Sequence, residues 1–539
     1  MQAGGIGMKR YDLIVVGAGP SGLSAAIEAA KYGLNVAVFD ENTRPGGQLF
    51  KQVHKFFGSK EHKAKIRGFQ IGQDLLAEAK ALGVEVILNA TVTGLFQDKE
   101  ITVKIADAIC HYKADSIIVA TGAAENTVPF AGWTLPGVMG AGAAQTLMNL
   151  HGIKPGNKIL MLGSGNVGLV VGYQLLQAGC ELAALVDASP KVGGYGVHAA
   201  KLARAGVPFF LSHTIVQAKG NDHVTGVEIA QVDENWKVIP ASKKYFEVDT
   251  ICMAVGLSPM AQLINMAGAK METNPQKGGC VPISNAYGET SLAGVFVAGD
   301  VAGVEEASSA MIEGHIAGVS AAAYLGFIGK EEQISRYKDL ESSLCKLRQG
   351  MFSLENRGKV PSTTEEGYAT ANNLLYQGFC TEEEVLRFPG TTKQVGVHAV
   401  IECLQNIPCN PCQEACARHC IKIGEKITSL PSVDEEKTCS GCGMCVASCS
   451  GQAIFLVDES YADGYASVTM PYEFLPLPQV GEIGWALDRS GEAVCKTEVV
   501  QVKTSPVFDH TNLLTIKVPV DKAMSARFFK GGVFHAIHK

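Results

Sequence analysis

The sequence predicts a multidomain α/β fold that ends in a small α+β segment and a β-domain. Three observations predict it. A unit of buried strand, glycine-rich turn, helix and second strand occurs twice, nine of the sixteen cysteines crowd between Cys403 and Cys449, and apolar and polar residues alternate beyond Tyr461. Because 539 residues are too many for one hydrophobic core, roughly three or four domains are expected.

Charge and composition exclude several kinds of partner. The formal charge of -7 and the pI near 6.0 give no basic surface for nucleic acid or anionic lipid, so neither partner is expected. No apolar run reaches the roughly 18 residues that span a bilayer, and the glycine-rich start lacks the regions of a signal peptide. A cytoplasmic protein without a membrane span is therefore expected. The clustering of the cysteines favours metal binding over disulfides.

The first strand-turn-helix unit begins at Tyr11, in YDLIVVGAGPSGLSAAIEAAKYGLNVAVFDEN. Gly17, Gly19 and Gly22 form GxGxxG, in which the missing side chains let a pyrophosphate approach the backbone and the helix N-terminus. Asp40 ends the second strand, where an acid accepts a hydrogen bond from a ribose 2′-hydroxyl, and Glu41 could substitute for it. This unit predicts a Rossmann-like dinucleotide site.

The second unit begins at Lys158, in KILMLGSGNVGLVVGYQLLQAGCELAALVDAS, and repeats the same order. Gly163, Gly165 and Gly168 restore the fingerprint, and Asp187 would accept a ribose hydroxyl and repel a 2′-phosphate. NAD(H) is therefore favoured over NADP, while another adenine nucleotide or an empty structural fold remain alternatives. The strand TSLAGVFVAGDVAG, from Thr290, is expected to return the chain to the first domain, so the second domain is inserted in the first.

Three further segments resemble two-dinucleotide-binding flavoproteins of the thioredoxin-reductase and amino-acid-oxidoreductase kind. They are RPGGQLF (Arg44 to Phe50), VATGAA (Val119 to Ala124) and VFVAGD (Val295 to Asp300). The resemblance implies FAD in the first domain. No CxxC pair follows the first glycine turn or stands in the second domain, so the usual thiol route for electrons is absent.

The residues expected to bind the two nucleotides lie in the two strand-turn-helix units and in the segments that carry the resemblance, apart from Val92. For FAD they are Gly17, Gly19, Pro20, Ser21, Gly22, Asp40, Glu41, Gly47, Gln48, Val92, Thr121, Gly122, Gly299 and Asp300. For the second nucleotide they are Gly163, Gly165, Asn166, Val167, Gly168 and Asp187.

The cysteine-rich segment has ferredoxin spacing. Its second half reads CxxCxxCxxxC, in which three thiolates bind one cubane and the fourth reaches another. Superposing CARHCIKI at Cys416 on CSGQAIF at Cys449 pairs Cys420 with Ala453, so Cys420 is not expected to be a ligand. One [4Fe-4S] cluster is then assigned to Cys403, Cys409, Cys412 and Cys449, and the other to Cys439, Cys442, Cys445 and Cys416.

Some features of this segment leave alternatives open. Ala417 and Ser450 stand where a proline usually follows the fourth cysteine of a ferredoxin motif. Structural zinc is one alternative, because CxxC pairs also build zinc sites, and a single cluster is another. Outside the segment, small core residues are expected at Cys180, Cys252 and Cys280, and packing or surface histidines at His54, His198, His213 and His315. No catalytic acid or base is identified.

These motifs divide the chain into five parts. The expected domains are an FAD-binding domain at 8–130 and 285–330, a second dinucleotide domain at 131–284, a helical connector at 331–400, a ferredoxin-like domain at 401–460 and a small β-domain at 461–539.

A second resemblance concerns function. The stretches GSGNVGLVVGYQLLQAG, GGYGVHAAKLARAGVP (Gly193 to Pro208) and VAGDVAG resemble the FAD subunits of opine oxidase, hydrogen cyanide synthase and dye-linked proline dehydrogenase, over roughly residues 8–400. In that family a separate flavoprotein subunit dehydrogenates the amine, and electrons pass through iron-sulfur centres. The resemblance implies an FAD and iron-sulfur subunit of an amine or amino-acid dehydrogenase complex, acting on proline-like or N-substituted amino acids.

That interpretation implies particular partners, and two others stand beside it. The implied hetero-oligomer contains an oxidase-like flavoprotein subunit and a small iron-sulfur subunit or ferredoxin. The first alternative is an NAD(H):ferredoxin-type oxidoreductase with a glycerol-3-phosphate dehydrogenase-like partner. The second is a redox-sensing or scaffolding subunit whose clusters only hold the fold.

Overall fold

The computed structural model describes residues 9–353 and 372–532, so the glycine-rich start and part of the expected connector lie outside it. The chain forms two compact units, one of Met1–Glu125 with Gly256–Lys359 and the other of Asn126–Val255 with Val360–Lys539. The chain thus returns to unit 1 at Gly256, earlier than the return expected at 285. Within the described ranges, no helix is both long and apolar enough to cross a membrane.

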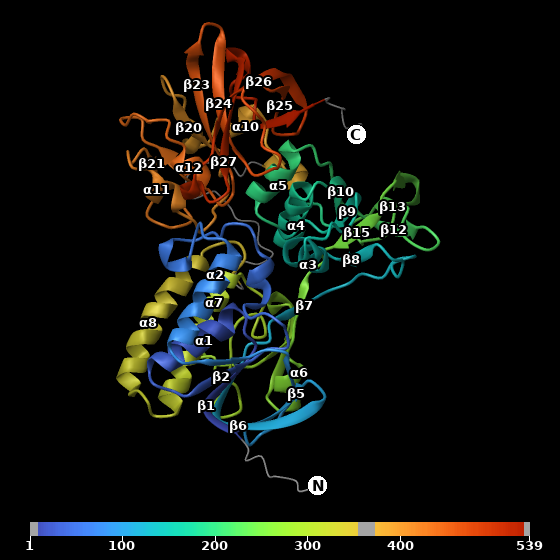
Figure 1. The fold of residues 1–539 in the computed structure, drawn as a ribbon. Helices are drawn as coiled ribbons and strands as arrows, with labels where there is room; N and C mark the ends of the chain where they lie inside the picture. Colours follow the sequence, from blue (N-terminus) through green and yellow to red (C-terminus); the bar gives the residue numbers. More distant parts are fainter. Residues whose placement is uncertain (1–8, 354–371, 533–539) are drawn as a thin grey trace. The chain divides into compact units, whose positions relative to one another are not determined.

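Unit 1 is built on a mixed seven-stranded sheet in the order β3-β2-β1-β6-β5-β4, with β19 beside β6 (Figure 1). The strands β1, β2, β3, β6 and β19 run parallel, whereas β4, β5 and the start of β6 form an antiparallel meander. The bounds are β1 (Lys9–Val16), β2 (Val36–Phe39), β3 (Glu85–Ile87), β4 (Ala90–Leu95), β5 (Glu100–Ile105), β6 (Ala108–Val119) and β19 (Val295–Val297). Two short ladders complete the unit, β7 (Ala123–Glu125) with β16 (Leu257–Pro259) and β17 (Met271–Asn274) with β18 (Gly279–Pro282).

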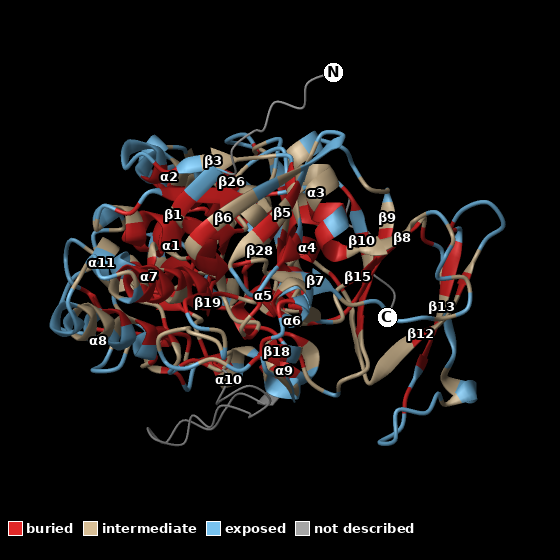
Figure 2. Cartoon of the chain, turned by 90° about the horizontal axis from the view of Figure 1, so that it is seen from below, coloured by how far each residue is buried: buried red, intermediate tan, exposed pale blue. Residues whose placement is uncertain are grey.

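Helices cover this sheet, and its central strands are buried on both faces (Figure 2). They are α1 (Pro20–Lys31), α2 (Gly68–Ala81), α6 (Gln262–Met266), α7 (Ala307–Tyr324) and α8 (Lys330–Leu347). Alternate residues of β1 face two cores, because Leu13 packs with α1, α2 and α7, whereas Ile14 packs with α6 and the meander. The helices α1 and α7 approach closely at Gly314, where a Cβ would lie 2.1 Å from Ser21 O.

A buried ion-pair network ties α1 to α7 and α8. The Glu28 side chain is 2% exposed, and it pairs with Arg336 at 2.6 Å and with His315 at 2.9 Å. Burial raises the pKa of Glu28, but the hydrogen bonds from His315 and Arg336 outweigh it and bring this pKa to about 2. The network therefore stabilises unit 1 in full above pH ~4.5, the ordinary pKa of a glutamate, and the stabilisation is lost as pH falls from there towards 2.

We expect Glu28→Gln to lower the free energy of unfolding of unit 1 by about 2 kcal/mol at neutral pH. The loss is kept moderate because Arg336 and His315 are partly exposed and can be solvated when their partner is removed. Denaturant unfolding between pH 7 and 3 measures it, and the gap between the two proteins should shrink as the pH falls. The exposed Glu331→Gln, on α8, is the control and should change little. A gap that stays constant down to pH 3 would contradict the assignment.

The first part of unit 2 contains a parallel five-stranded sheet in the order β11-β10-β9-β15-β8. The bounds are β8 (Val138–Gly140), β9 (Lys158–Leu162), β10 (Glu181–Asp187), β11 (Phe209–Leu211) and β15 (Thr250–Met253). Helices α3 (Ala141–His151), α4 (Asn166–Gln177) and α5 (Gly196–Arg204) pack in one core with this sheet. A second core contains the antiparallel ladder of β12 (His213–Lys219), β13 (Gly226–Gln231) and β14 (Lys244–Phe246).

The last part of unit 2 is an antiparallel seven-stranded sheet in the order β20-β23-β24-β27-β26-β25-β28. The bounds are β20 (His398–Ile401), β23 (Ile454–Ala462), β24 (Tyr465–Tyr472), β25 (Ile483–Leu487), β26 (Ala493–Lys503), β27 (Asn512–Pro519) and β28 (Phe528–Gly531). Between β20 and β23 lie α11 (Pro411–Ala415), β21 (Ile421–Lys422), β22 (Ser432–Val433) and α12 (Met444–Ser448), and before them α9 (Asn372–Gln377) and α10 (Glu382–Val385). The cysteine-rich segment and the terminal strands thus share one sheet, across the boundary expected at 460.

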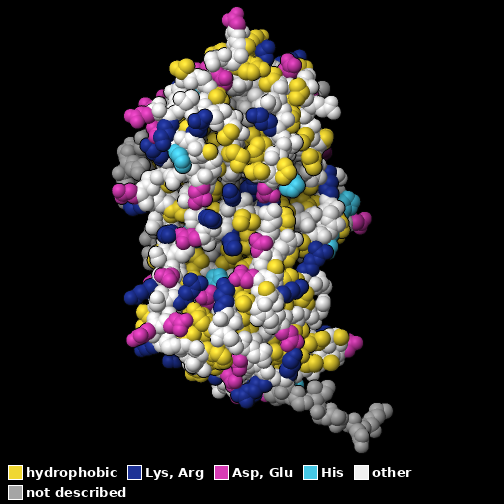
Figure 3. Space-filling model, turned by 60° about the vertical axis from the view of Figure 1, so that its left-hand side comes forward, with side chains coloured by type: hydrophobic (Ala, Val, Ile, Leu, Met, Phe, Trp, Pro, Cys, Tyr) yellow, Lys and Arg dark blue, Asp and Glu magenta, His cyan; other side chains and the backbone are white. Residues whose placement is uncertain are grey.

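The face of the molecule drawn in Figure 3 has no large patch of one charge. Acidic and basic side chains are interspersed with apolar ones on the face drawn in Figure 3.

Candidate functional sites

The glycine turn of unit 1 joins β1 to α1, and two of its three glycines are required by close contacts within the protein. Gly17 has φ +105°, and a Cβ there would lie 2.4 Å from Ala120 O, while a Cβ on Gly22 would lie 1.9 Å from Gly17 O. Gly19 is the N-cap of α1, which has no side-chain cap and no acid in its first turn. A Cβ on Gly19 would meet nothing within 4 Å. The turn therefore leaves open space at a helix N-terminus that can accept an anion such as a pyrophosphate.

Asp40 lies under this turn and is 6% exposed. One of its carboxylate oxygens accepts from Ala18 N at 2.6 Å, and the other accepts from the backbone and side chain of Asn42 at 2.8 Å each. Its first role is thus to brace the turn, which the sequence pattern did not predict. A carboxylate has further lone pairs, so a ribose hydroxyl could still be accepted. Glu41 is exposed beside it.

The RPGG loop after β2 comes next to the same turn. Gly46 N donates to Ala18 O at 2.6 Å, and a Cβ on Gly47 would lie 2.9 Å from the Cα of Gly19. Gln48, which follows, is exposed. Val92 lies on β4, two residues after Ala90, whose amide donates to Asp40 O at 2.9 Å.

The returning segment after β19 reaches the start of α1. A Cβ on Gly299 would lie 2.6 Å from the Ser21 hydroxyl, and Gly299 N donates to Glu313 at 2.9 Å. Asp300 accepts from the backbone of Glu305 at 3.2 Å. The expected flavin residues of β1, α1, β2 and the return are therefore gathered around one turn.

Thr121 and Gly122 follow β6, and Glu313 lies on α7. Thr121 donates to Met260 O at 2.7 Å, and a Cβ on Gly122 would meet nothing within 4 Å. Burial and the neighbouring Glu305 raise the pKa of Glu313 to about 7, although Arg348 opposes the shift. No sequence pattern predicted that Glu313 would be placed here, because its burial next to Glu305 and Gly299 arises only when the chain folds.

The glycine turn of unit 2 repeats the first in detail. Ser164 N donates to Asp187 at 2.7 Å, as Ala18 N does to Asp40, and a Cβ on Gly163 would lie 2.2 Å from Ala254 O. Gly165 is the uncapped N-cap of α4, and a Cβ there would meet nothing within 4 Å. The remaining expected residues are Asn166, which accepts from Tyr195 N, the exposed Val167, and Gly168, where a Cβ would lie 2.1 Å from Gly163 O.

The repeat extends to a double glycine that the motif search missed. Gly193 and Gly194 follow Asp187 at the distance in sequence at which Gly46 and Gly47 follow Asp40. The second glycine, Gly194, donates from its N to Ser164 O at 2.8 Å, whereas in the first turn it is the first glycine, Gly46, that donates to Ala18 O. This equal spacing after Asp40 and Asp187 is the sequence feature that could have predicted the second loop. The second turn is thus built like the first one, down to the loop that lies on it.

The cysteine-rich segment is an internal repeat. The helices α11 and α12 each end just before a cysteine, Cys416 and Cys449. The Cys416 sulfur accepts from Cys420 N at 3.2 Å, and the Cys449 sulfur accepts from Ala453 N at 3.4 Å. His419 and Gln452, at matching positions, have left-handed φ of 54° and 51°. The expected superposition of Cys416 on Cys449 is therefore present in the backbone.

The strands follow the same symmetry. β20 precedes the first cysteine set and pairs with β23 after the second, whereas β21 after the first set pairs with β22 before the second. Each half thus contributes a strand, a cysteine loop, a short helix and a strand.

The thiols lie in two neighbourhoods that share Cys412. Burial, and next the thiols of Cys449 and Cys412, raise the pKa of Cys403. Burial and the thiols of Cys439, Cys412, Cys442 and Cys416 raise the pKa of Cys445. In the described ranges no three His, Cys, Asp or Glu side chains come close enough to hold one metal ion. The cysteines of a cubane bind different iron atoms, so their sulfurs need not converge on one point.

This donor set fits an iron-sulfur group. Buried thiols with raised pKa lose their protons on metal binding, because the metal stabilises the thiolate. Cys420 is buried, with its sulfur 3.9 Å from Arg418 O. Among the cysteines expected in cores, Cys180 and Cys252 are buried, but Cys280 is exposed on β18, so that expectation is wrong.

Comparisons with known proteins give the class. The family profile described as pyridine nucleotide-disulphide oxidoreductase matches residues 11–314. The chain belongs to this family, and it is a FAD-dependent oxidoreductase.

Sequence comparison with curated proteins identifies more specific relatives within this class. An opine oxidase subunit of Agrobacterium tumefaciens is 30% identical over 64% of this chain and 72% of its own length. The hydrogen cyanide synthase subunit HcnB of Pseudomonas aeruginosa is 28% identical over 62% of this chain and 75% of its own. The solved L-proline dehydrogenase from P. horikoshii is 20% identical, with 62% of this chain and 60% of that chain covered at a TM-score of 0.49, a likeness that does not bear on function. The chain is therefore a flavin-dependent oxidoreductase related to the opine oxidase and hydrogen cyanide synthase subunits.

Proposed function

We propose that the chain is the FAD and iron-sulfur subunit of an amine or amino-acid dehydrogenase complex that acts on proline-like or opine-like substrates. The observation that carries this proposal is the cysteine repeat around Cys416 and Cys449, in a chain whose residues 11–314 match the pyridine nucleotide-disulphide oxidoreductase family. Bound FAD takes up electrons as a pair and releases them singly, whereas each [4Fe-4S] cluster carries one.

The residues of the chain hold and orient these groups in the proposal. The uncapped N-terminus of α1 binds the FAD pyrophosphate, and Asp40 fixes the turn beneath it. One cluster is held by Cys403, Cys409, Cys412 and Cys449, and the other by Cys439, Cys442, Cys445 and Cys416. The backbone amides of Cys420 and Ala453 donate to one thiolate of each, which stabilises its negative charge.

The proposed partners follow from the relatives. The opine oxidase and hydrogen cyanide synthase relatives both carry subunit names, which supports a hetero-oligomer. We propose an oxidase-like flavoprotein subunit that dehydrogenates the amine, together with a small iron-sulfur subunit or ferredoxin.

A second candidate is an NAD(H):ferredoxin-type oxidoreductase with a glycerol-3-phosphate dehydrogenase-like partner. One observation favours it. The turn around Gly163 and Gly165 repeats that of the flavin site, and α4 begins without a cap. An ADP moiety, as in NAD or another adenine nucleotide, is the chemistry that such a turn recognises.

An anaerobic reductive titration separates the candidates. We expect NADH to leave the flavin absorbance unchanged, and we expect a proline-like or opine-like amino acid to bleach it once the oxidase-like subunit is added. Electron paramagnetic resonance signals of reduced cubanes should then appear. Bleaching by NADH alone would favour the second candidate. A flavin bleached by dithionite without any cubane signal would overturn the iron-sulfur assignment.

A further inference from the structure

Helix α5 holds the loop that carries the last cysteine. Tyr173 of α4 donates to the Gln452 side chain at 2.9 Å, and Arg204 of α5 donates to Gln452 O at 3.0 Å. A Cβ on Gly451 would lie 3.0 Å from Val197 of α5. The Cys449–Gln452 loop thus lies against the nucleotide-type half of unit 2.

Two cations of α5 are buried beside this loop. Lys201 is 3% exposed with its ammonium 4.6 Å from the Tyr173 ring centroid, and Arg204 is 6% exposed with its guanidinium 5.4 Å from the Phe455 ring centroid. In the described part of the chain no carboxylate lies within ion-pair distance of Arg204, whose hydrogen bond goes to a neutral carbonyl. A guanidinium buried without a counter-ion costs several kcal/mol.

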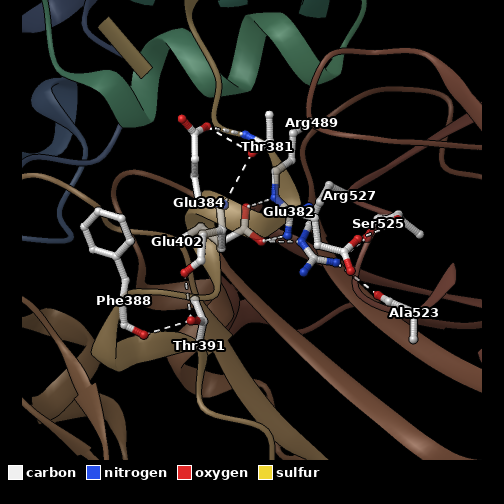
Figure 4. Close-up of polar contacts among 12 residues, drawn as sticks. Thr381, Glu382, Glu384, Phe388, Thr391, Glu402, Arg489, Ala523, Ser525 and Arg527 are labelled. Atoms are coloured by element: carbon white, nitrogen blue, oxygen red, sulfur yellow. Dashed lines mark hydrogen bonds and ion pairs between the residues drawn. The ribbon is translucent and has the colours of Figure 1, made fainter. Parts of the chain in front are cut away.

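Glu402 is an acid near Arg204, but it already serves two other arginines. Arg489 donates to both its oxygens, at 2.6 and 3.1 Å, and Arg527, fully buried, donates to one of them (Figure 4). Glu382 also acts on the charge of Arg527, so two carboxylates, Glu402 and Glu382, stand against the three guanidinium groups of Arg489, Arg527 and Arg204, and one positive charge is left over. The arginines around Glu402, together with Arg204, therefore make the region next to Cys403 and Cys449 positive.

A thiolate-bound cubane would supply a balancing anion. Four thiolates outweigh the charge of the iron-sulfide core, so the group is a net anion, and reduction adds a further negative charge. A buried cation therefore stabilises the reduced form more than the oxidised one, with little screening by salt. The second cysteine set has a different setting, because Cys442 is exposed and the nearby Lys437 is at the surface.

We propose that Arg204, assisted by Lys201, is the counter-charge that sets the reduction potential of the cluster held by Cys403, Cys409, Cys412 and Cys449 and makes it the more easily reduced of the two. This inference rests on the proposed function. Arg204 acts as a positioning residue that does not ligate iron. The reduction adds one electron and no proton, and dithionite supplies that electron in the test.

The test is a potentiometric titration of the full chain with dithionite, followed by electron paramagnetic resonance. We expect Arg204→Gln to shift one cluster signal to lower potential by about tenfold in the ratio of reduced to oxidised form, which is about 59 mV for one electron. The other signal should keep its potential. Arg204→Lys keeps the positive charge, so its cluster potential should lie close to that of the unaltered protein. The signal that survives in Cys442→Ala identifies the cluster beside α5.

Lys437→Gln is the matched control, because it removes a cation near the other cysteine set but at the surface. It should leave the cluster beside α5 unmoved. Should Arg204→Gln fail to assemble, Lys201→Gln and Arg204→Lys carry the same measurement with smaller shifts. Two signals with unchanged potentials in Arg204→Gln and Lys201→Gln would overturn the inference while leaving the clusters established. Absence of cubane signals in the unaltered protein would instead overturn the proposed function.

Discussion

Replacing Gly22 by alanine is expected to abolish FAD binding and to destabilise unit 1 by about 3 kcal/mol or more. The added Cβ would lie 1.9 Å from Gly17 O and 3.3 Å from a methyl group of Val15. The contact is with backbone, which cannot move aside without opening the β1-turn-α1 connection. FAD content per chain after purification and denaturant unfolding of unit 1 measure the two effects.

Alanine variants at two other glycines distinguish steric strain within the protein from loss of contact with the ligand. Gly329 is the N-cap of α8, and a Cβ there would meet nothing within 4 Å, so Gly329→Ala should keep FAD and stability. Gly19 also has room for a Cβ, but that room faces the expected pyrophosphate. Gly19→Ala should therefore leave unfolding nearly unchanged while weakening FAD binding. A Gly19→Ala protein that binds FAD normally would place the pyrophosphate elsewhere.

The two glycine turns illustrate what the sequence could predict. Their spacing predicted the strand, turn and helix of each unit, because a GxGxxG turn is a local structure that depends on missing Cβ atoms. Asp40 was expected to face the ribose, yet its oxygens first accept bonds from Ala18 and Asn42. A sequence motif therefore suggests which ligand a side chain binds more readily than it shows the hydrogen bonds that the same side chain makes within the protein.

The cysteine segment illustrates the limit for long-range structure. The repeat from Cys416 to Cys449 could be aligned because it is local, and the backbone follows it. The merging of β20 and β23 with the terminal strands depends on pairing between residues far apart, such as His398 with Val457, and on β24 pairing with β27. Alternating apolar and polar residues predict a strand but not the strands that pair with it. The domain boundary expected at 460 therefore could not take account of the strand pairing that crosses it.

The burial of individual residues was the property hardest to predict from the sequence. Cys280, Cys180 and Cys252 all lie in apolar or glycine-rich surroundings, but Cys280 falls on the exposed side of a two-stranded ladder. Likewise, the triad of Glu402, Arg489 and Arg527 joins residues from distant segments. Such ion pairs carry no periodic signal, since only the folded chain brings the charges together.

Replacing Cys442 by alanine is expected to remove one iron-sulfur cluster and to leave FAD bound. Cys442 is a proposed ligand in unit 2, whereas the flavin turn lies in unit 1, so loss of the ligand should not reach the flavin residues. Iron per FAD should fall by about half, and one cubane signal should remain. Iron analysis, visible absorbance and electron paramagnetic resonance of the purified chain measure this.

Cys280→Ala is the matched control, because Cys280 is also exposed but lies outside both cysteine sets. It should change neither iron nor FAD. Loss of FAD in Cys442→Ala would mean that the two units do not bind their groups independently. Retention of all iron would mean that Cys442 is not a ligand, and the swapped assignment of the eight cysteines would then have to be abandoned.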